Sequence, residues 1–173
     1  ISPDALHKSD VGGVLLSLKD EADVAAGFKA IRENLRRYKE DAHFGGVRIQ
    51  KMATEGYDMF VGGRQDPSFG PVVFFGMGGI HVEAFKDIAN VVCPTVPGSV
   101  EKRYLQLKSA AVLAGMRGKV PGDTEAFIDL VVKTSHLLAD FPGIKELDIN
   151  PVRVFPAGAG VMALDARARL ALI

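Results

Sequence analysis

The sequence contains one cysteine, carries no net charge and has no long apolar run. Its 21 Lys and Arg residues balance 21 Asp and Glu residues. A neutral chain without a long basic run is a poor candidate for binding nucleic acid or anionic membrane. Cys93 cannot form an internal disulfide, which favours a reducing cytoplasmic location. No apolar run reaches the roughly 18 residues of a membrane span, so we expect neither membrane nor nucleic acid as a partner.

Apolar residues make up 47% of the 173-residue chain, which is enough for a hydrophobic core and argues against disorder. This length corresponds to one ordinary domain or to two small lobes that share a cleft. The first residue is Ile1 rather than methionine, and no structural element is visible before "ISPDALHKSD". We expect the chain to be part of a longer protein.

Three segments place apolar residues on one helical face and carry capping signals. They are residues 21–38 after Asp20, residues 100–114 before Gly115, and residues 124–138 after Asp123 or Thr124. Apolar or alternating runs predict strands. These are residues 14–18, 46–52, 57–64 (after a short turn at 54–56) and 72–77, and a closing hairpin over 144–170. The order favours a mixed α/β (α+β) fold with a partly antiparallel sheet and flanking helices.

The closing hairpin predicts a metal site. Strand side chains alternate between faces, so Glu146, Asp148 and Asn150 would share one face. A turn in the following Pro/Gly segment would place Asn150 opposite Asp165. Mg²⁺ prefers such oxygen ligands and completes its shell with water and phosphate oxygens. The alternative is a solvated polar strand face, which is the more common arrangement, although Pro151 ends the strand just after the amide.

Two glycine-rich stretches could let backbone amides approach phosphate groups, but neither matches a P-loop or a dinucleotide fingerprint. The first contains Gly12 and Gly13, and tight turns explain such pairs at least as often. The second precedes Glu83 and Asp87, whose spacing would place them on one helical face. Glu83 and Asp87 could bind metal or position His7, which lies shortly before the first glycine pair, or they could lie at a solvated helix start.

His7 could accept a phosphoryl group, because neutral imidazole is a competent nucleophile. The alternative is a turn histidine bonded to backbone.

Four stretches run in order through nearly the whole chain: "SPDALHKSDVGGV", "DPSFGPVVFFGMGGIHVEAFKD", "LAGMRG" and "IKELDINPVRV…ALDARARL". Together they resemble the ATP-grasp (β) part of ADP-forming acetyl-CoA and acyl-CoA synthetases, relatives of succinyl-CoA synthetase. The resemblance implies an ATP-grasp fold that is incomplete at its N-terminus. Residues 1–50 would be the remainder of a first lobe, and residues 51–173 the C-terminal lobe.

The resemblance implies an enzyme, an acid–thiol ligase that interconverts acyl-CoA, ADP and phosphate with organic acid, CoA and ATP through phosphohistidine. The histidine of the "HKSD" motif, a second phosphoryl carrier in this family, is His7, and the acids expected to orient it are Glu83 and Asp87. The ligands of Mg²⁺, the implied cofactor, match Asn150 and Asp165, with Asp148 where relatives carry a nearby acid.

The resemblance also implies a nucleotide site, with ATP or ADP as substrate. The adenine-binding hinge corresponds to Gln50, Lys51 and Met52, and further contacts are expected from Gly12, Gly13 and Asp58. Relatives commonly have Glu at Asp58 and Arg at Gln65, and a shorter acid and a lost cation near the nucleotide cleft could weaken turnover or tune specificity. The CoA chemistry would need a CoA-binding ligase domain or subunit, the α part of the synthetase, and we expect an oligomer.

Two other functions stay open on the sequence alone. Similar ATP-grasp parts occur as regulatory modules of multidomain protein acetyltransferases, and the departures at Asp58 and Gln65 fit such a loss of catalysis slightly. The family's ATP-grasp part also begins some tens of residues earlier than this chain. The second possibility is therefore a structural half-domain that needs the missing segment before it can bind nucleotide.

Overall fold

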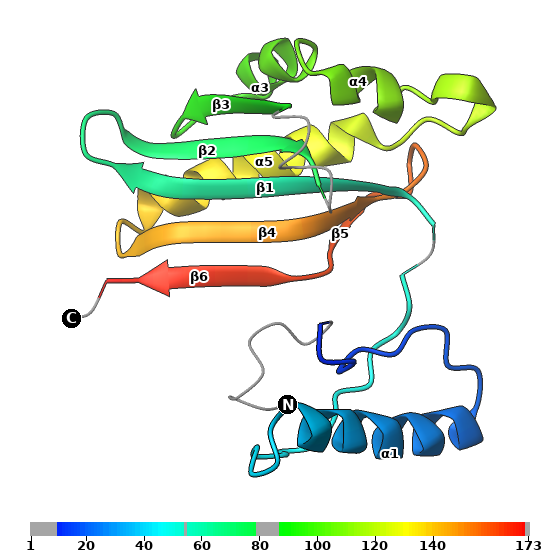
Figure 1. Ribbon diagram of the computed structural model, residues 1–173. Coiled ribbons are helices and arrows are strands. Elements are labelled where there is room, and N and C mark those ends of the chain that lie inside the picture. Colours follow the sequence, from blue (N-terminus) through cyan, green and yellow to red (C-terminus); the bar gives the residue numbers. More distant parts are fainter. Residues whose placement is uncertain (1–9, 54, 79–86, 172–173) are drawn as a thin grey trace. The chain divides into compact units, whose positions relative to one another are not determined.

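A computed structural model describes residues 10–53, 55–78 and 87–171 (Figure 1). The chain divides into two compact units, Ile1–Met52 and Ala53–Ile173. The assignment of these units to the remnants of two ATP-grasp lobes, with a boundary at residues 50 and 51, stays a prediction. Each unit is described by itself below.

The first unit is built around helix α1 (Glu21–Tyr38). Asp20 caps it as expected, because its carboxylate accepts a hydrogen bond of 2.9 Å from the Asp23 backbone N–H. The ring of Phe28 meets that of Phe44 edge to face, with 5.3 Å between centroids. This contact fastens the segment that follows α1 onto the helix.

The second unit contains a six-stranded sheet in the order β3-β2-β1-β4-β5, with β6 also bonded to β4. Its strands are β1 (Tyr57–Asp66), β2 (Gly70–Met77), β3 (Ile88–Val92), β4 (Ile144–Val154), β5 (Val161–Ala163) and β6 (Ala166–Leu170). All pairings among the described strands are antiparallel. The expected α/β fold with a partly antiparallel sheet is confirmed, and the second arm of the closing hairpin is split into β5 and β6.

Two of the expected strands, residues 14–18 and 46–52, are wrong. Ser17 has a φ of 60°, in the left-handed region, which interrupts an extended chain, and Leu16 remains 66% exposed. Residues 46–52 were expected to form a hairpin with β1. That pairing is not available, because β2 and β4 already occupy both edges of β1.

Among its described residues, the second unit has four helical segments. They are α3 (Pro97–Tyr104), α4 (Lys108–Leu113), the 3₁₀ turn η2 (Met116–Gly118) and α5 (Thr124–Asp140). Helix α5 lies across one face of the sheet (Figure 1). The side chains between them are fully buried and include Met59, Val61, Val73, Phe75, Phe127, Val131, Leu138, Val152 and Val154. None of the helices in the described part of the chain is long and apolar enough to span a membrane.

The single helix expected over residues 100–114 is instead two short helices, α3 and α4. The chain turns between them and buries Leu107, which is 8% exposed. A new helix then starts because the carboxylate of Asp87, 21 residues earlier in the chain, accepts the backbone N–H of Lys108 at 2.8 Å and that of Ser109 at 2.7 Å. The expected stop at Gly115 is confirmed by its φ of 90°.

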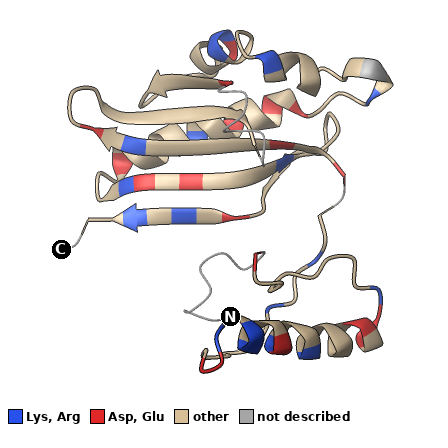
Figure 2. Ribbon diagram, viewed as in Figure 1, with Lys and Arg blue, Asp and Glu red and all other residues tan. Residues whose placement is uncertain are grey.

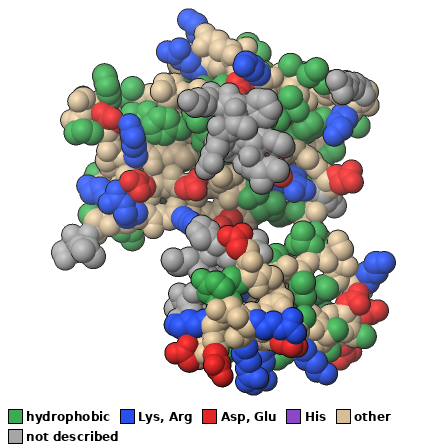
Figure 3. Space-filling model, in the orientation of Figure 1, with side chains coloured by type: hydrophobic (Ala, Val, Ile, Leu, Met, Phe, Trp, Pro, Cys, Tyr) green, Lys and Arg blue, Asp and Glu red, His purple; other side chains and the backbone are tan. Residues whose placement is uncertain are grey.

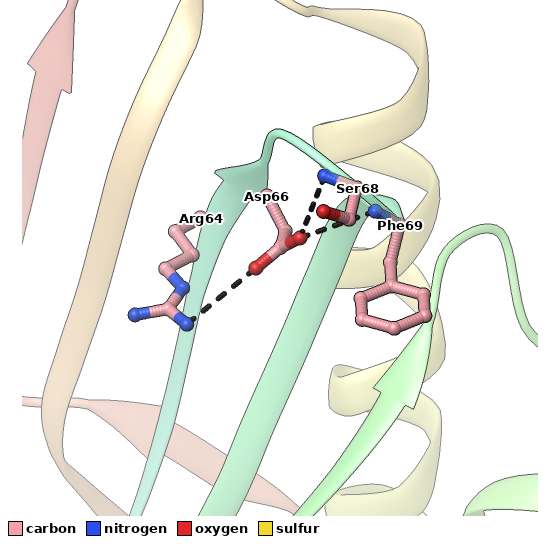
Figure 4. A network of polar contacts seen from close by, with 4 residues as sticks. All are labelled: Arg64, Asp66, Ser68 and Phe69. Carbon is pink, nitrogen blue, oxygen red and sulfur yellow. Dashed lines mark hydrogen bonds and ion pairs between the residues drawn. The ribbon is translucent and has the colours of Figure 1, made fainter.

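The turn between β1 and β2 is held by Asp66 (Figure 4). Its Oδ1 accepts the backbone N–H groups of Ser68 at 2.9 Å and Phe69 at 3.1 Å, and Arg64 lies 3.6 Å from its Oδ2. The two backbone hydrogen bonds lower the pKa of Asp66 most, and Arg64 adds to them. The segment "DPSFGP" is therefore a turn, as expected, and it fixes the register of the two strands.

Candidate functional site

The sheet face opposite α5 carries many charged side chains and is called the charged face below. Met59, Val61 and Gly63 of β1 face α5, so the alternate residues of β1 lie on the charged face. Figure 2 shows acidic bands on β4 beside basic bands on β6. In Figure 3 acidic and basic side chains adjoin one another over these two strands. The charged face comprises Asp58, Arg64, Glu146, Asp148, Arg153, Asp165, Arg167 and Arg169.

The closing hairpin places Asn150 opposite Asp165, in the register that the sequence indicates. The backbone N–H of Asn150 donates to the Asp165 carbonyl at 3.1 Å, and that of Leu164 donates to the Pro151 carbonyl at 3.0 Å. Directly opposed residues of antiparallel strands have neighbouring side chains. The pairing therefore places Asn150 and Asp165 directly opposite one another along the backbone, while the convergence of their side chains on a metal ion stays a prediction.

Strand β4 changes face at this point. Leu147 and Ile149 pack against the core, and beyond Asn150 the fully buried residues are Val152 and Val154. Ile149 and Val152 both face the core although three positions separate them, so the strand does not alternate strictly here. The β1–β4 register also shifts between Met59 and Val61, which marks a β-bulge. The alternation expected for Glu146, Asp148 and Asn150 thus holds for the two acids and is interrupted at Asn150, whose peptide bond to Pro151 is cis.

The carboxylate of Glu146 forms an ion pair with Arg169 of β6. Arg169 donates through Nε to Oε2 at 3.1 Å and through Nη2 to Oε1 at 2.6 Å, a bidentate geometry. The hydrogen bond from Arg169 is the main cause of the lowered pKa of Glu146. Glu146 is therefore a poor candidate for a metal ligand.

Asp148 and Asp165 form the remaining acidic pair. Asp148 lies opposite Gly62 on β1 and opposite Arg167 on β6. Gly62 contributes no side chain at the position opposite Asp148. Arg167 Nε lies 3.9 Å from Asp165 Oδ2, and Asp165 Oδ1 accepts the backbone N–H of Ala166 at 3.0 Å.

The donor set fits Mg²⁺ and does not fit an ion caged by protein alone. Across residues 10–53, 55–78 and 87–171, no three His, Cys, Asp or Glu side chains are grouped so that they could hold a metal ion. Two carboxylates and one amide remain, from Asp148, Asp165 and Asn150. Mg²⁺ uses one or two carboxylates and completes its shell with water and phosphate oxygens.

Asp58 and Gln65, the two positions where the chain departs from the family pattern, each make a side-chain hydrogen bond. Asp58 Oδ1 accepts Arg153 Nε at 2.7 Å across the β1–β4 pair, on the charged face. Gln65 lies on the other face, where its side-chain amide donates through Nε2 to the Leu138 carbonyl of α5 at 3.0 Å. The interpretation of Gln65 as a lost cation beside the nucleotide is therefore not supported, because its side chain is directed toward α5.

The remaining predicted residues of the nucleotide site lie in the first unit, and His7 and Glu83 lie outside the described residues. Gly12 has a φ of 64°, and its carbonyl accepts Asn34 Nδ2 at 3.0 Å; a Cβ there would meet the same Nδ2 at 2.6 Å. This favours a tight turn against α1, although a phosphate contact by Gly12 or its neighbour Gly13 stays a prediction. The hinge residues Gln50, Lys51 and Met52 are exposed.

Asp87, predicted to orient the histidine, instead has its carboxylate bound to the first amides of α4. Partial burial would raise its pKa, but the hydrogen bonds from Ser109 and Lys108 outweigh this and lower the pKa overall. A structural role in starting α4 is thus shown, and a catalytic role stays a prediction.

Sequence reasoning missed the basic residues of the charged face. Arg153, Arg167 and Arg169 each lie next to an acid across or along the sheet. The alternation in "DARARL" is a signal that two of these arginines share a face with Asp165, whereas the Asp58–Arg153 pair spans 95 residues of sequence.

Comparison with known proteins identifies the family of this chain. The ATP-grasp domain family matches residues 1–170. The chain belongs to the ATP-grasp domain family.

Within this family the chain is closely related to β subunits of ADP-forming synthetases. It is 41% identical over 167 residues to the β subunit of acetate–CoA ligase (ADP-forming) I from Pyrococcus furiosus, covering 96% of this chain and 71% of the subunit. It is 39% identical over 166 residues to 4-hydroxybutyrate–CoA ligase (ADP-forming) from Nitrosopumilus maritimus, covering 96% of this chain but 24% of that protein.

A solved structure also superposes on this chain. It is the dinucleotide-forming acetyl-coenzyme A synthetase 1 of Ca. Korarchaeum cryptofilum, in complex with coenzyme A and Mg-AMPPCP and with a phosphohistidine segment pointing towards the nucleotide-binding site. The TM-score is 0.86 at 34% identity, over 99% of this chain and 74% of that one. The expected ATP-grasp fold is thereby confirmed.

Proposed function

We propose that this ATP-grasp chain is the nucleotide-binding, phosphoryl-transferring part of a cytoplasmic, ADP-forming acyl-CoA synthetase. The enzyme would interconvert acyl-CoA, ADP and phosphate with organic acid, CoA and ATP. The observation that carries the proposal is the backbone pairing of Asn150 with Asp165 at the β4 bulge. This pairing joins the two residues that match the family's metal ligands, on a face with a further acid, Asp148.

In this proposal Asn150 and Asp165 hold Mg²⁺, with Asp148 nearby. The ion would neutralise charge on the nucleotide phosphates and align the γ-phosphoryl group for in-line transfer. His7 then accepts that group: a bond forms between its ring nitrogen and phosphorus as the bond from phosphorus to the departing ADP oxygen breaks. The hinge residues Gln50 to Met52 would contact adenine through their backbone.

The CoA chemistry requires a complementary part. The chain covers 24% of the relative from Nitrosopumilus maritimus and 71% of the Pyrococcus furiosus subunit. We therefore propose that it works with a CoA-binding ligase domain or subunit, in an oligomeric assembly. The relatives are named as ligases, which favours this function over a regulatory module of an acetyltransferase.

Phosphoryl labelling tests the proposal. The complete synthetase would be incubated with Mg²⁺ and ATP labelled at the γ position, and acid-labile label on this chain would be measured. We expect His7→Ala to lose this label. We expect Asp165→Asn to raise the Mg²⁺ concentration needed for half-maximal labelling by about tenfold or more, because one carboxylate ligand is lost.

Glu146→Gln is the matched control, because it converts an acid to an amide on the same face but alters a residue already bound by Arg169. Full labelling of His7→Ala would reject the acceptor role. An equal Mg²⁺ requirement for Asp165→Asn and Glu146→Gln would reject the metal centre. Calorimetry with Mg·ADP, without the complementary part, tests the structural half-domain, which would bind no nucleotide.

A further inference from the structure

A positively charged side chain lies beside both carboxylates of the candidate metal centre. Arg167 Nε is 3.9 Å from Asp165 Oδ2, and Arg167 is directly opposite Asp148 in the β4–β6 register. The side chain of Arg167 is 71% exposed. A single contact at this distance on a solvated side chain holds the guanidinium loosely, so it can move without a large loss of stability.

Arg169, two residues along the same strand, is in a different situation. It is held by Glu146 through two hydrogen bonds of 2.6 and 3.1 Å. The Glu146–Arg169 pair is therefore self-neutralised. Asp148 and Asp165 carry two negative charges at the candidate metal centre, and Arg167 carries a positive charge opposite Asp148 and 3.9 Å from Asp165.

We propose that Arg167 is a specificity-determining residue that makes this site select a metal–nucleotide complex over the free metal ion. This inference depends on the metal centre of the proposed function. Arg167 supplies the counter-charge for Asp148 and Asp165 when no nucleotide is bound. Because like charges repel, it weakens the binding of a free divalent cation.

A nucleotide reverses the effect of this arginine. Its phosphates bring negative charge together with the metal, and the planar guanidinium matches phosphate oxygens in a way that a carboxylate cannot. Arg167 then leaves the carboxylates for the phosphates and adds to the affinity of the complex. One side chain thus lowers affinity for the bare ion and raises it for the metal–nucleotide complex.

The test is binding of Mn²⁺, measured by the paramagnetic resonance signal of the free ion, on the complete synthetase. We expect Arg167→Gln to tighten binding of Mn²⁺ alone by roughly three- to tenfold, as expected for removing one unit charge close to a divalent ion in a solvated, screened site. The same variant should bind Mn·ADP about threefold or more weakly. Arg167→Lys keeps the charge and should retain the wild-type affinity for Mn²⁺ alone.

The matched control is Arg169→Gln, which removes the same charge from the same strand. We expect it to change either affinity by less than about twofold, because Arg169 is paired with Glu146 and lies farther from Asp165. Equal effects of the two variants would show a general charge effect and overturn the proposal. Unchanged or weaker binding of Mn²⁺ alone to Arg167→Gln would also overturn it.

Asp165→Asn separates this inference from the proposed function. Loss of Mn²⁺ binding in Asp165→Asn, combined with no gain in Arg167→Gln, would reject the role of Arg167 and leave the metal centre intact. Unchanged Mn²⁺ binding in Asp165→Asn would reject the metal centre itself, and the role of Arg167 with it.

Discussion

Replacing Asp123 by alanine tests how the closing hairpin is held in place. Its carboxylate accepts the backbone N–H of Ala126 at 3.1 Å, as the N-cap of α5, and that of Gly160 at 2.8 Å, in the turn between β4 and β5. The residue is 9% exposed. Asp123 therefore joins the start of α5 to the turn of the hairpin that carries Asn150 and Asp165.

The expected cost of Asp123→Ala follows from these two bonds. Loss of an N-cap typically destabilises by about 0.5–2 kcal/mol. The N–H of Gly160, which is half-buried, loses its partner at a cost of about 1–2 kcal/mol. Together we expect the free energy of unfolding of the second unit to fall by about 1.5–4 kcal/mol.

Urea unfolding followed by tyrosine fluorescence measures this change, since the chain has three tyrosines and no tryptophan, and Tyr57 and Tyr104 lie in the second unit. Amide exchange at Gly160 reports the same bond locally. Asp20→Ala is the matched control, because it removes a cap that accepts the Asp23 backbone N–H at the exposed start of α1, at a cost of about 1 kcal/mol. Equal destabilisation by both variants, with unchanged exchange at Gly160, would refute the reasoning.

The pH dependence has a definite sign. The backbone hydrogen bonds from Ala126 and Gly160 lower the pKa of Asp123 below its usual 3.8. A lowered folded pKa means that the stabilisation is fully present above the unfolded pKa and is lost as the pH falls through the folded value. Wild-type protein should therefore lose more stability below about pH 4 than Asp123→Asn does.

Two further predictions concern the core. Gly63→Ala would push a Cβ into the Leu138 side chain and within 3.1 Å of the Val72 carbonyl, so we expect the free energy of unfolding in urea to fall by about 1–3 kcal/mol. Gly143→Ala is the control and should cost less, because there is open space around Gly143. Gly70 is a poor control because its φ is 75°. Burial raises the pKa of Cys93 from 9.0 to about 11, so alkylation of the native protein at pH 8 should be about a hundredfold slower than that of a free thiol. Rapid native-state labelling would contradict that burial.

Local signals in the sequence were sufficient for the helices with capping residues and for the hairpin register. Asp20 and Asp123 each lie immediately before a helix, and each accepts a hydrogen bond from an amide in its first turn. The pairing of Asn150 with Asp165 follows from counting outward from a Pro/Gly turn. Each of these signals acts over a few residues or one hairpin, where the chain itself defines the geometry.

The predictions from sequence that were wrong concern residues whose contacts lie far away along the chain. The break between α3 and α4 depends on Asp87, 21 residues before Lys108. The direction of Gln65 depends on Leu138, 73 residues later. The strand expected over 46–52 is excluded because β4, near the end of the chain, pairs with β1. Nothing near these residues in the sequence encodes such partners.

The position of the candidate metal centre is set by core packing as much as by its ligands. On β4, Asp148 before the bulge and Arg153 after it both lie on the charged face. Strict alternation would put these two residues on opposite faces, because an odd number of positions separates them. The partner arm changes face as well, because Arg167 opposes Asp148 whereas Met162 opposes Arg153.

Both arms therefore switch together, so that Leu147, Ile149, Val152 and Val154 can all pack toward α5. Asn150 and Asp165 lie where the two arms switch. Lengthening or shortening either arm by one residue at this point would turn one half of its side chains to the wrong face. The same packing that buries the valines thus fixes where Asn150 and Asp165 lie opposite one another.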